Sequence, residues 1–177
     1  RRSFSTGNEV VDESAFVVLD KLEREYQLGI DKGEKKLVPD LFETDASYSR
    51  YRDKISKIAQ TLSDKEKVDL SVAHLEMGIF EVAQSLAEEV ANVEINKISG
   101  TYLLGLALIY GGKAIEATIR LEPLARDLTL PEVYKSDFLY LMGLAFEKLN
   151  EFRKAKEFYR RVFLLNPKYR DIAEKLK

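Results

Sequence analysis

The sequence predicts an all-α protein built from repeated helical hairpins, and two observations predict it. Apolar residues recur every three or four positions along most of the chain, which is the spacing of one helix face. Small residues recur in pairs, in register, through the later part of the chain, and a short break in the apolar pattern lies between the two members of each pair. Helical spacing is clear in two series near the N-terminus: Ala15, Phe16, Leu19, Leu22 and Tyr26, then Ile55, Ile58, Ala59 and Leu62.

The composition excludes several classes of chemistry. The chain has 177 residues, no cysteine and one histidine, with a formal net charge of -2. A disulfide framework, a thiolate metal site and a cysteine nucleophile are therefore excluded, and we expect no metal, no cofactor and no enzymatic activity. A net charge this close to zero argues against binding to nucleic acid through overall electrostatic attraction. Because no run of 18 apolar residues occurs, we expect no membrane span.

The chain divides into an N-terminal arm, residues 1–46, and a helical repeat domain, residues 47–177. The arm holds one amphipathic helix at about 12–28, followed by a loop over 29–47 whose glycines and Pro39 interrupt the apolar period. A helix is expected over 47–62. Ser63 and Glu66 form a capping box, so the next helix should begin at this point.

The repeat is visible when three small residues are aligned. Ser71, Gly105 and Gly143 lie 34 and 38 positions apart, and each is followed twelve positions later by an alanine. These alanines are Ala83, Ala117 and Ala155. Each alanine follows a short break in the apolar pattern, at Met77-Gly78, Gly111-Gly112 and Leu149-Asn150. Two helices joined by a tight turn approach closely where side chains are small, so we expect these residues to pack the two helices of each hairpin together. The predicted repeats are 64–97, 98–131 and 136–169.

A capping helix over 168–177 is expected to close the last repeat, because a stack of repeats needs a polar outer face at its end. Ile172 and Leu176 should pack inward, while Arg170, Glu174 and Lys177 should face water. Earlier in the chain, Pro123 falls inside a predicted second helix and should kink it, and Pro131 suits the first turn of the helix that follows.

A 34-residue period of paired helices is typical of the tetratricopeptide repeat (TPR), and residues 64–177 resemble a three-repeat module of this family. The last repeat carries the resemblance most clearly. Seven of its residues stand at the family's Trp, Leu, Gly, Tyr, Ala, Phe and Pro positions: Leu139, Met142, Gly143, Phe146, Ala155, Tyr159 and Pro167. Three features together are similar to modules at the ends of bacterial multidomain signalling and motility proteins: Glu76-Met77-Gly78, the extended entry to the third repeat around Leu130-Pro131, and the stretch 166–176.

The resemblance implies a right-handed α-solenoid that has no catalytic site and binds other proteins in the cytoplasm. Such modules hold a peptide or protein in a concave groove lined by the first helix of each pair. At these positions the sequence has ten residues, called the trough residues below: Val68, Val72, Leu75, Tyr102, Leu106, Ile109, Tyr110, Tyr140, Leu144 and Glu147. The Lys, Asn and Arg residues with which some members grip a terminal carboxylate are absent from these positions.

An apolar, tyrosine-rich trough suits an amphipathic helix of a partner protein, in a signalling, polarity or motility context. Two alternatives stay open. The trough could be filled by the helix at 12–28, from this chain or from a neighbouring molecule in a homodimer. The second and less favoured alternative is that the protein binds an anionic surface, either nucleic acid or lipid. The binding would use a basic patch on one helix face, formed by Arg153, Lys156 and Arg160. His74, which has no second ligand-type partner in the pattern, is expected to be a buried structural imidazole.

Overall fold

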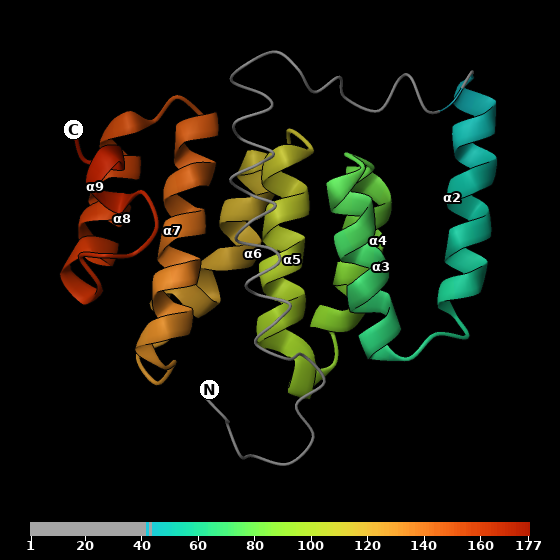
Figure 1. Cartoon of the computed structure of the whole chain (residues 1–177), viewed down its shortest axis with the longest axis horizontal. Coiled ribbons are helices and arrows are strands. Elements are labelled where there is room, and N and C mark those ends of the chain that lie inside the picture. Colours follow the sequence, from blue (N-terminus) through green and yellow to red (C-terminus); the bar gives the residue numbers. More distant parts are fainter. Residues whose placement is uncertain (1–41, 43) are drawn as a thin grey trace. The chain divides into compact units, whose positions relative to one another are not determined.

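The computed structural model describes Phe42 and residues 44–177, and the regular structure of these residues is entirely helical (Figure 1). The predicted helix at 12–28 and the loop that follows it lie outside the described residues, apart from the end of that loop. The chain divides into two compact units, the first ending at Leu103 and the second running Leu104–Lys177. The division falls within α5, Lys97–Tyr110.

The first unit contains α2 (Asp45–Ala59), α3 (Asp64–Glu76), α4 (Phe80–Ala91) and the short 3-10 helix η2 (Glu94–Asn96). α2 begins two residues before the position expected from the sequence, because Thr44 and Ser47 form a capping box that the apolar pattern does not reveal. The Ser47 amide donates to Thr44 Oγ1 at 3.1 Å, and the Thr44 amide donates to Ser47 Oγ at 3.2 Å.

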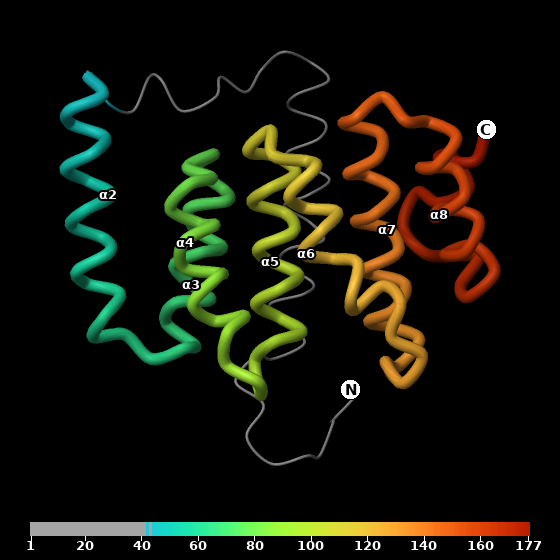
Figure 2. Tube along the Cα trace, turned by 180° about the vertical axis from the view of Figure 1, so that it is seen from behind, coloured from blue at the N-terminus to red at the C-terminus, as the bar shows by residue number. Residues whose placement is uncertain are grey.

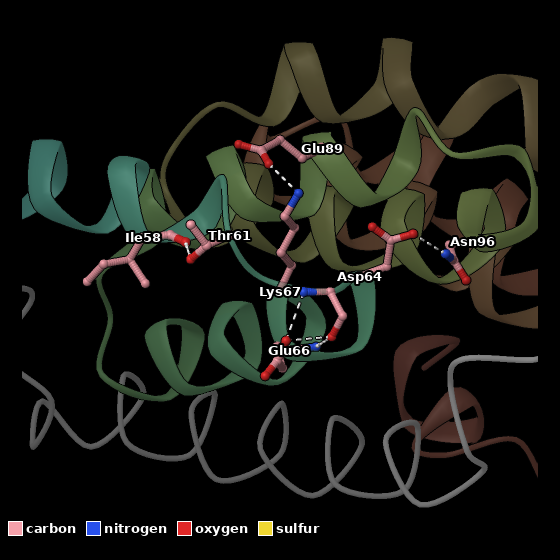
Figure 3. Close-up of polar contacts among 8 residues, drawn as sticks. Ile58, Thr61, Asp64, Glu66, Lys67, Glu89 and Asn96 are labelled. Atoms are coloured by element: carbon pink, nitrogen blue, oxygen red, sulfur yellow. Dashed lines mark hydrogen bonds and ion pairs between the residues drawn. The ribbon is translucent and has the colours of Figure 1, made fainter.

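The predicted capping box at the start of α3 is confirmed. The Ser63 amide donates to Glu66 Oε2 at 2.8 Å, and the Glu66 amide donates to Ser63 Oγ at 3.4 Å (Figure 3). Two longer-range polar contacts then fix the surroundings of α3. Lys67 pairs with Glu89 of α4 at 2.8 Å, and Asn96 of η2 donates to Asp64 at 2.8 Å.

α2 packs on α4 through a small apolar cluster. Its buried members are Ala59, Ile79, Val82 and Leu86, and partly buried residues pack around them: Phe42, Tyr48, Tyr51, Ile55 and Leu70. The ring of Phe42 lies 5.2 Å from that of Tyr48 and 5.1 Å from that of Tyr51, measured between centroids. Phe42 therefore extends the hydrophobic surface of α2 by packing on its first two turns.

The second unit contains the C-terminal part of α5, then α6 (Ala114–Arg126), α7 (Glu132–Lys148), α8 (Phe152–Leu165) and α9 (Ile172–Lys175). α7 packs against both α6 and α8, and α9 packs against α8 (Figure 2). Pro123 lies inside α6, as expected. Pro131 is the N-cap of α7, one position before the first helical turn in which it was expected, and its carbonyl accepts from the Lys135 amide at 2.9 Å.

The capping helix is shorter than the predicted 168–177, because only residues 172–175 are helical. Ile172 is fully buried and Glu174 and Lys177 are exposed, as expected. The prediction for Arg170 is wrong: its side chain is 9% exposed and pairs with Asp137 of α7 at 3.8 Å. Its guanidinium also lies over the rings of Tyr140 and Tyr169, at 4.9 and 5.1 Å from their centroids, so aromatic stacking compensates for the lost hydration.

Candidate protein-binding surface

The three hairpin turns have one backbone geometry. Each contains a residue with positive φ, namely Gly78 (73°), Gly112 (79°) and Asn150 (60°), and these are spaced 34 and 38 positions apart like the small residues. In each turn the next amide donates to the carbonyl five positions earlier: Ile79 to His74 at 2.8 Å, Lys113 to Leu108 at 2.8 Å and Glu151 to Phe146 at 2.9 Å. These bonds close the C-terminal ends of α3, α5 and α7 in the same way.

Small residues lie where the helices of a hairpin come closest. A Cβ placed on Gly105 would lie 2.6 Å from Leu121 Cδ2, and a Cβ on Gly143 would overlap the ring of Tyr159. In both hairpins the contacting residue of the second helix comes sixteen positions after the glycine. At the matching place in the first hairpin, the buried Ser71 hydroxyl donates to the carbonyl of Ala83 at 3.0 Å.

The remaining packing residues are also buried, with one exception. Ala83 and Ala117 are 0% exposed, Ala155 is 1% exposed and Tyr159 is 0% exposed. Pro167 is the exception and lies exposed in the loop after α8. The part played by Leu121 as the partner of Gly105 was missed by the sequence reasoning, which could have found it from the matched sixteen-residue spacing.

The trough residues occupy three helices, each first in its hairpin. Val68, Val72 and Leu75 lie on α3; Tyr102, Leu106, Ile109 and Tyr110 lie on α5; Tyr140, Leu144 and Glu147 lie on α7. In the structure seven of the ten are buried, and Val72, Tyr110 and Glu147 are partly exposed. The burial is most complete on α5, where Tyr102, Leu106 and Ile109 are 1–3% exposed.

The C-terminal segment, residues 169–175, engages the trough residues of α7. Tyr140 Oη donates to Asp171 at 2.6 Å, and Lys175 Nζ pairs with Glu147 at 2.8 Å. Tyr169 Oη donates in turn to Asp137 of α7. On α7, therefore, two of the three predicted trough residues already hold a segment of this chain, an arrangement that their position in the repeat did not reveal.

Tyr159 lies beneath this segment. The centroid of the Tyr159 ring is 5.6 Å from that of Tyr140. Lys175 Nζ lies 5.7 Å from the same Tyr159 centroid. Burial, followed by the nearby carboxylate of Glu147, raises the pKa of the Tyr159 hydroxyl above its usual value. The phenol therefore stays protonated, and its role is to fill the space that Gly143 leaves open.

His74 is buried at 1% exposure and has two hydrogen-bond partners. Its Nδ1 lies 2.6 Å from the Leu70 carbonyl and its Nε2 lies 2.8 Å from Tyr51 Oη. A carbonyl only accepts, so Nδ1 carries the proton and Nε2 of the neutral ring accepts from the tyrosine. Burial lowers the pKa of His74, against a smaller opposing effect of the Leu70 carbonyl. The imidazole is thus buried and structural, as the sequence predicted, and the structure adds that it links α2 to α3.

The predicted basic patch lies on the outward face of α8. Arg153 and Arg160 are exposed and Lys156 is partly exposed. Arg153 is 3.8 Å from Glu157, and no ion pair among the described residues involves Lys156 or Arg160. Large apolar side chains are exposed on the same helix, which the sequence reasoning missed: Phe152 at 60%, Phe163 at 38% and Leu164 at 81%. Phe152 and Phe163 lie four positions before and seven positions after Lys156, and Leu164 lies four positions after Arg160. This helical spacing could have placed them beside the basic patch from the sequence alone.

Comparison with known proteins gives no relative: no protein-family model, no curated protein and no solved structure matches this chain. None of the helices in the described part is both long and apolar enough to cross a bilayer. Within residues 44–177, no three His, Asp or Glu side chains come together in an arrangement that could hold a metal ion.

Proposed function

We propose that this chain is a non-enzymatic interaction module of the tetratricopeptide type, which stacks its hairpins into a solenoid and docks an amphipathic helix of a partner protein. The observation that carries the proposal is the repetition of one turn. A positive-φ residue, the same hydrogen bond across the turn and a small residue seven positions earlier recur three times, with offsets of 34 and 38. Repeated hairpins that share one geometry stack side by side, and their first helices then line a common face.

The chemistry of that face supports a helical ligand. The trough residues are apolar or aromatic except Glu147, and tyrosine provides large contact area with a polar tip. The family resemblance adds the context that we propose, which is bacterial signalling, polarity or motility in the cytoplasm.

Site-specific photo-cross-linking in the native host tests the proposal. A photoreactive amino acid at Val72 or Tyr110, which are partly exposed, should capture one partner through a helical segment. Matched controls at Ile115 and Ile119 place the same group on the exposed face of α6, where the side chains are 66% and 64% exposed. Capture from Ile119 as efficient as capture from Tyr110, or no capture from either trough position, would contradict the proposal.

The second candidate is that the helix expected at 12–28 fills the trough, in its own chain or in a neighbouring molecule. The apolar, tyrosine-rich composition of the trough residues favours it, because a continuous surface of such side chains is unfavourable in open contact with water. Deletion of residues 1–41 tests this candidate and keeps Phe42 and the Thr44 cap of α2. Increased quenching of tyrosine fluorescence by acrylamide, or a change of association state in light scattering, would support it; unchanged quenching and mass would reject it.

A further inference from the structure

We propose that the outward face of α8 is a docking surface for an anionic lipid bilayer. The face is defined by Arg153, Lys156, Arg160 and Leu164, which follow one another in steps of three, four and four, and by Phe152 and Phe163 beside them. Residues at such spacing lie on one side of a helix. The inference concerns a different face from the trough residues and does not depend on the proposed function.

The charge of α8 is the first argument. The helix carries five basic residues and one acidic residue, so its net charge is +4, although the whole chain carries -2. Lys156 and Arg160 have no acidic partner among the described residues, and the carboxylate of Glu157 is 3.8 Å from Arg153. Because charges in water act over roughly 8 Å at physiological ionic strength, a nearby anionic surface responds to this local charge and not to the total.

The exposed apolar side chains are the second argument, and they favour a bilayer over a nucleic acid. Phe152 lies one position before Arg153, and Phe163 and Leu164 lie just after the last cations of the helix. Leu164 is 81% exposed and Phe152 is 60% exposed. An aliphatic side chain gains free energy by entering the boundary between headgroups and acyl chains, whereas a phosphate backbone offers it no apolar environment.

α8 packs against its neighbours through one side only, so its outward face is free for this contact. Ala155, Tyr159 and Val162 are the buried residues of α8, and they lie on the opposite side from Arg153 and Arg160. Two other cations of the helix are engaged with neighbouring rings: Lys154 lies over Phe146 and Arg161 over Phe158. Docking therefore requires no unfolding of α8 and buries side chains that are already in water.

Vesicle co-sedimentation with the full chain tests the inference. We expect binding to vesicles of phosphatidylcholine with phosphatidylserine, and none to phosphatidylcholine alone. Each basic residue close to an anionic surface strengthens binding about fivefold, so Lys156→Gln with Arg160→Gln should weaken it about 25-fold. Leu164→Ser should weaken it about tenfold by removing the apolar insertion.

Matched controls remove the same groups elsewhere. Lys65→Gln with Arg126→Gln takes two exposed cations from α3 and α6, and Leu128→Ser replaces an apolar residue that is 87% exposed in the α6–α7 loop. These variants should bind as the parent does. Failure of the parent chain to bind the anionic vesicles, equal losses in the controls, or tighter binding to a DNA oligonucleotide that is insensitive to Leu164→Ser would overturn the inference.

Discussion

Close packing in the hairpins is decided by single atoms. Gly105 and Gly143 occupy the same place in their hairpins, but their neighbours differ in the freedom to move. Leu121 meets Gly105 with the methyl groups of a flexible side chain, whereas Tyr159 meets Gly143 with a flat ring that is fully buried. The free-energy cost of adding a methyl group should therefore differ between the two glycines.

We expect Gly143→Ala to lower the free energy of unfolding by about 3 kcal/mol, at the upper end for overpacking, and Gly105→Ala to cost about 1 kcal/mol. The Tyr159 ring cannot rotate away, but the Leu121 methyl groups can. Urea denaturation measures both. Gly112→Ala measures the opposite case, backbone strain without a steric clash, since its φ is +79° and no atom lies within 4 Å of the added Cβ, whereas Gly105 and Gly143 have no positive φ. Equal costs at Gly105 and Gly143 would contradict the ring argument.

His74 gives the molecule a pH dependence of known sign. Its pKa is lowered in the folded protein by burial, while in the unfolded chain it lies at about 6.5. Below about pH 6.5 the unfolded state therefore binds more protons, and the free energy of unfolding falls as pH falls, by at most about 1.4 kcal/mol per pH unit. The loss ends once the pH is below the folded-state pKa.

Thermal or urea unfolding between about pH 7 and pH 5 measures this effect, as the difference between the parent chain and His74→Gln. The variant lacks the titrating ring, so its stability should change less over this range. The carboxylates of both proteins titrate alike and cancel in the difference. Parallel pH profiles would show that the histidine is not held neutral.

At the scale of an element, the C-terminal segment depends on tertiary contacts for its structure. α9 has four residues, far fewer than the roughly 12 that an isolated helix needs for stability in water. Ile172 supplies its buried side chain, and Asp171 and Lys175 tie it to α7. Its order should therefore be lost before that of the longer helices.

We expect Ile172→Ala to release this segment locally. The side chain is fully buried, and its truncation costs about 2–5 kcal/mol, more than the free energy that keeps a four-residue helix ordered. Amide exchange followed by NMR should show loss of protection at Ile172, Glu174 and Lys175, with α4 unchanged. Leu164→Ala, which trims an exposed side chain, is the control and should leave these amides protected. Loss of protection throughout both units would instead indicate global unfolding.

At the scale of the whole molecule, burial is distributed unevenly among the helices. One of the fifteen residues of α2 is buried, whereas nine of the seventeen residues of α7 are buried. Local opening is easiest where few apolar side chains are buried, so the helices should differ in their stability against opening.

We therefore expect the amides of α2 to exchange with solvent at least about tenfold faster than those in the middle of α7, under conditions where both units are folded. Mass spectrometry of deuterated fragments measures the order. The comparison is internal to one sample, so solution conditions cancel. Protection of α2 equal to that of α7 would show that its partly buried rings, Phe42, Tyr48 and Tyr51, stabilise it as strongly as a buried core does.

Local chemistry made several features predictable. The Ser63–Glu66 capping box, the breaks at Gly78, Gly112 and Asn150, and the helical spacing are properties of residues close together in sequence. The Thr44–Ser47 box at the start of α2 was missed because serine, and not glutamate, supplies the return bond. Arg170 was misplaced because charge alone predicts exposure, whereas its burial depends on Asp137 and Tyr140 of α7, about thirty positions earlier in the chain, together with the adjacent ring of Tyr169.

The sequence by itself determined that the chain is helical, where its hairpins turn and where small residues recur, because turns, caps and apolar period depend on neighbours within a few positions. Only the tertiary structure decided that Tyr159 fills the space beside Gly143, that the C-terminal segment holds Tyr140 and Glu147, and which side chains of α8 stay in water. Those outcomes depend on which helix faces lie against one another, and no short-range pattern specifies that.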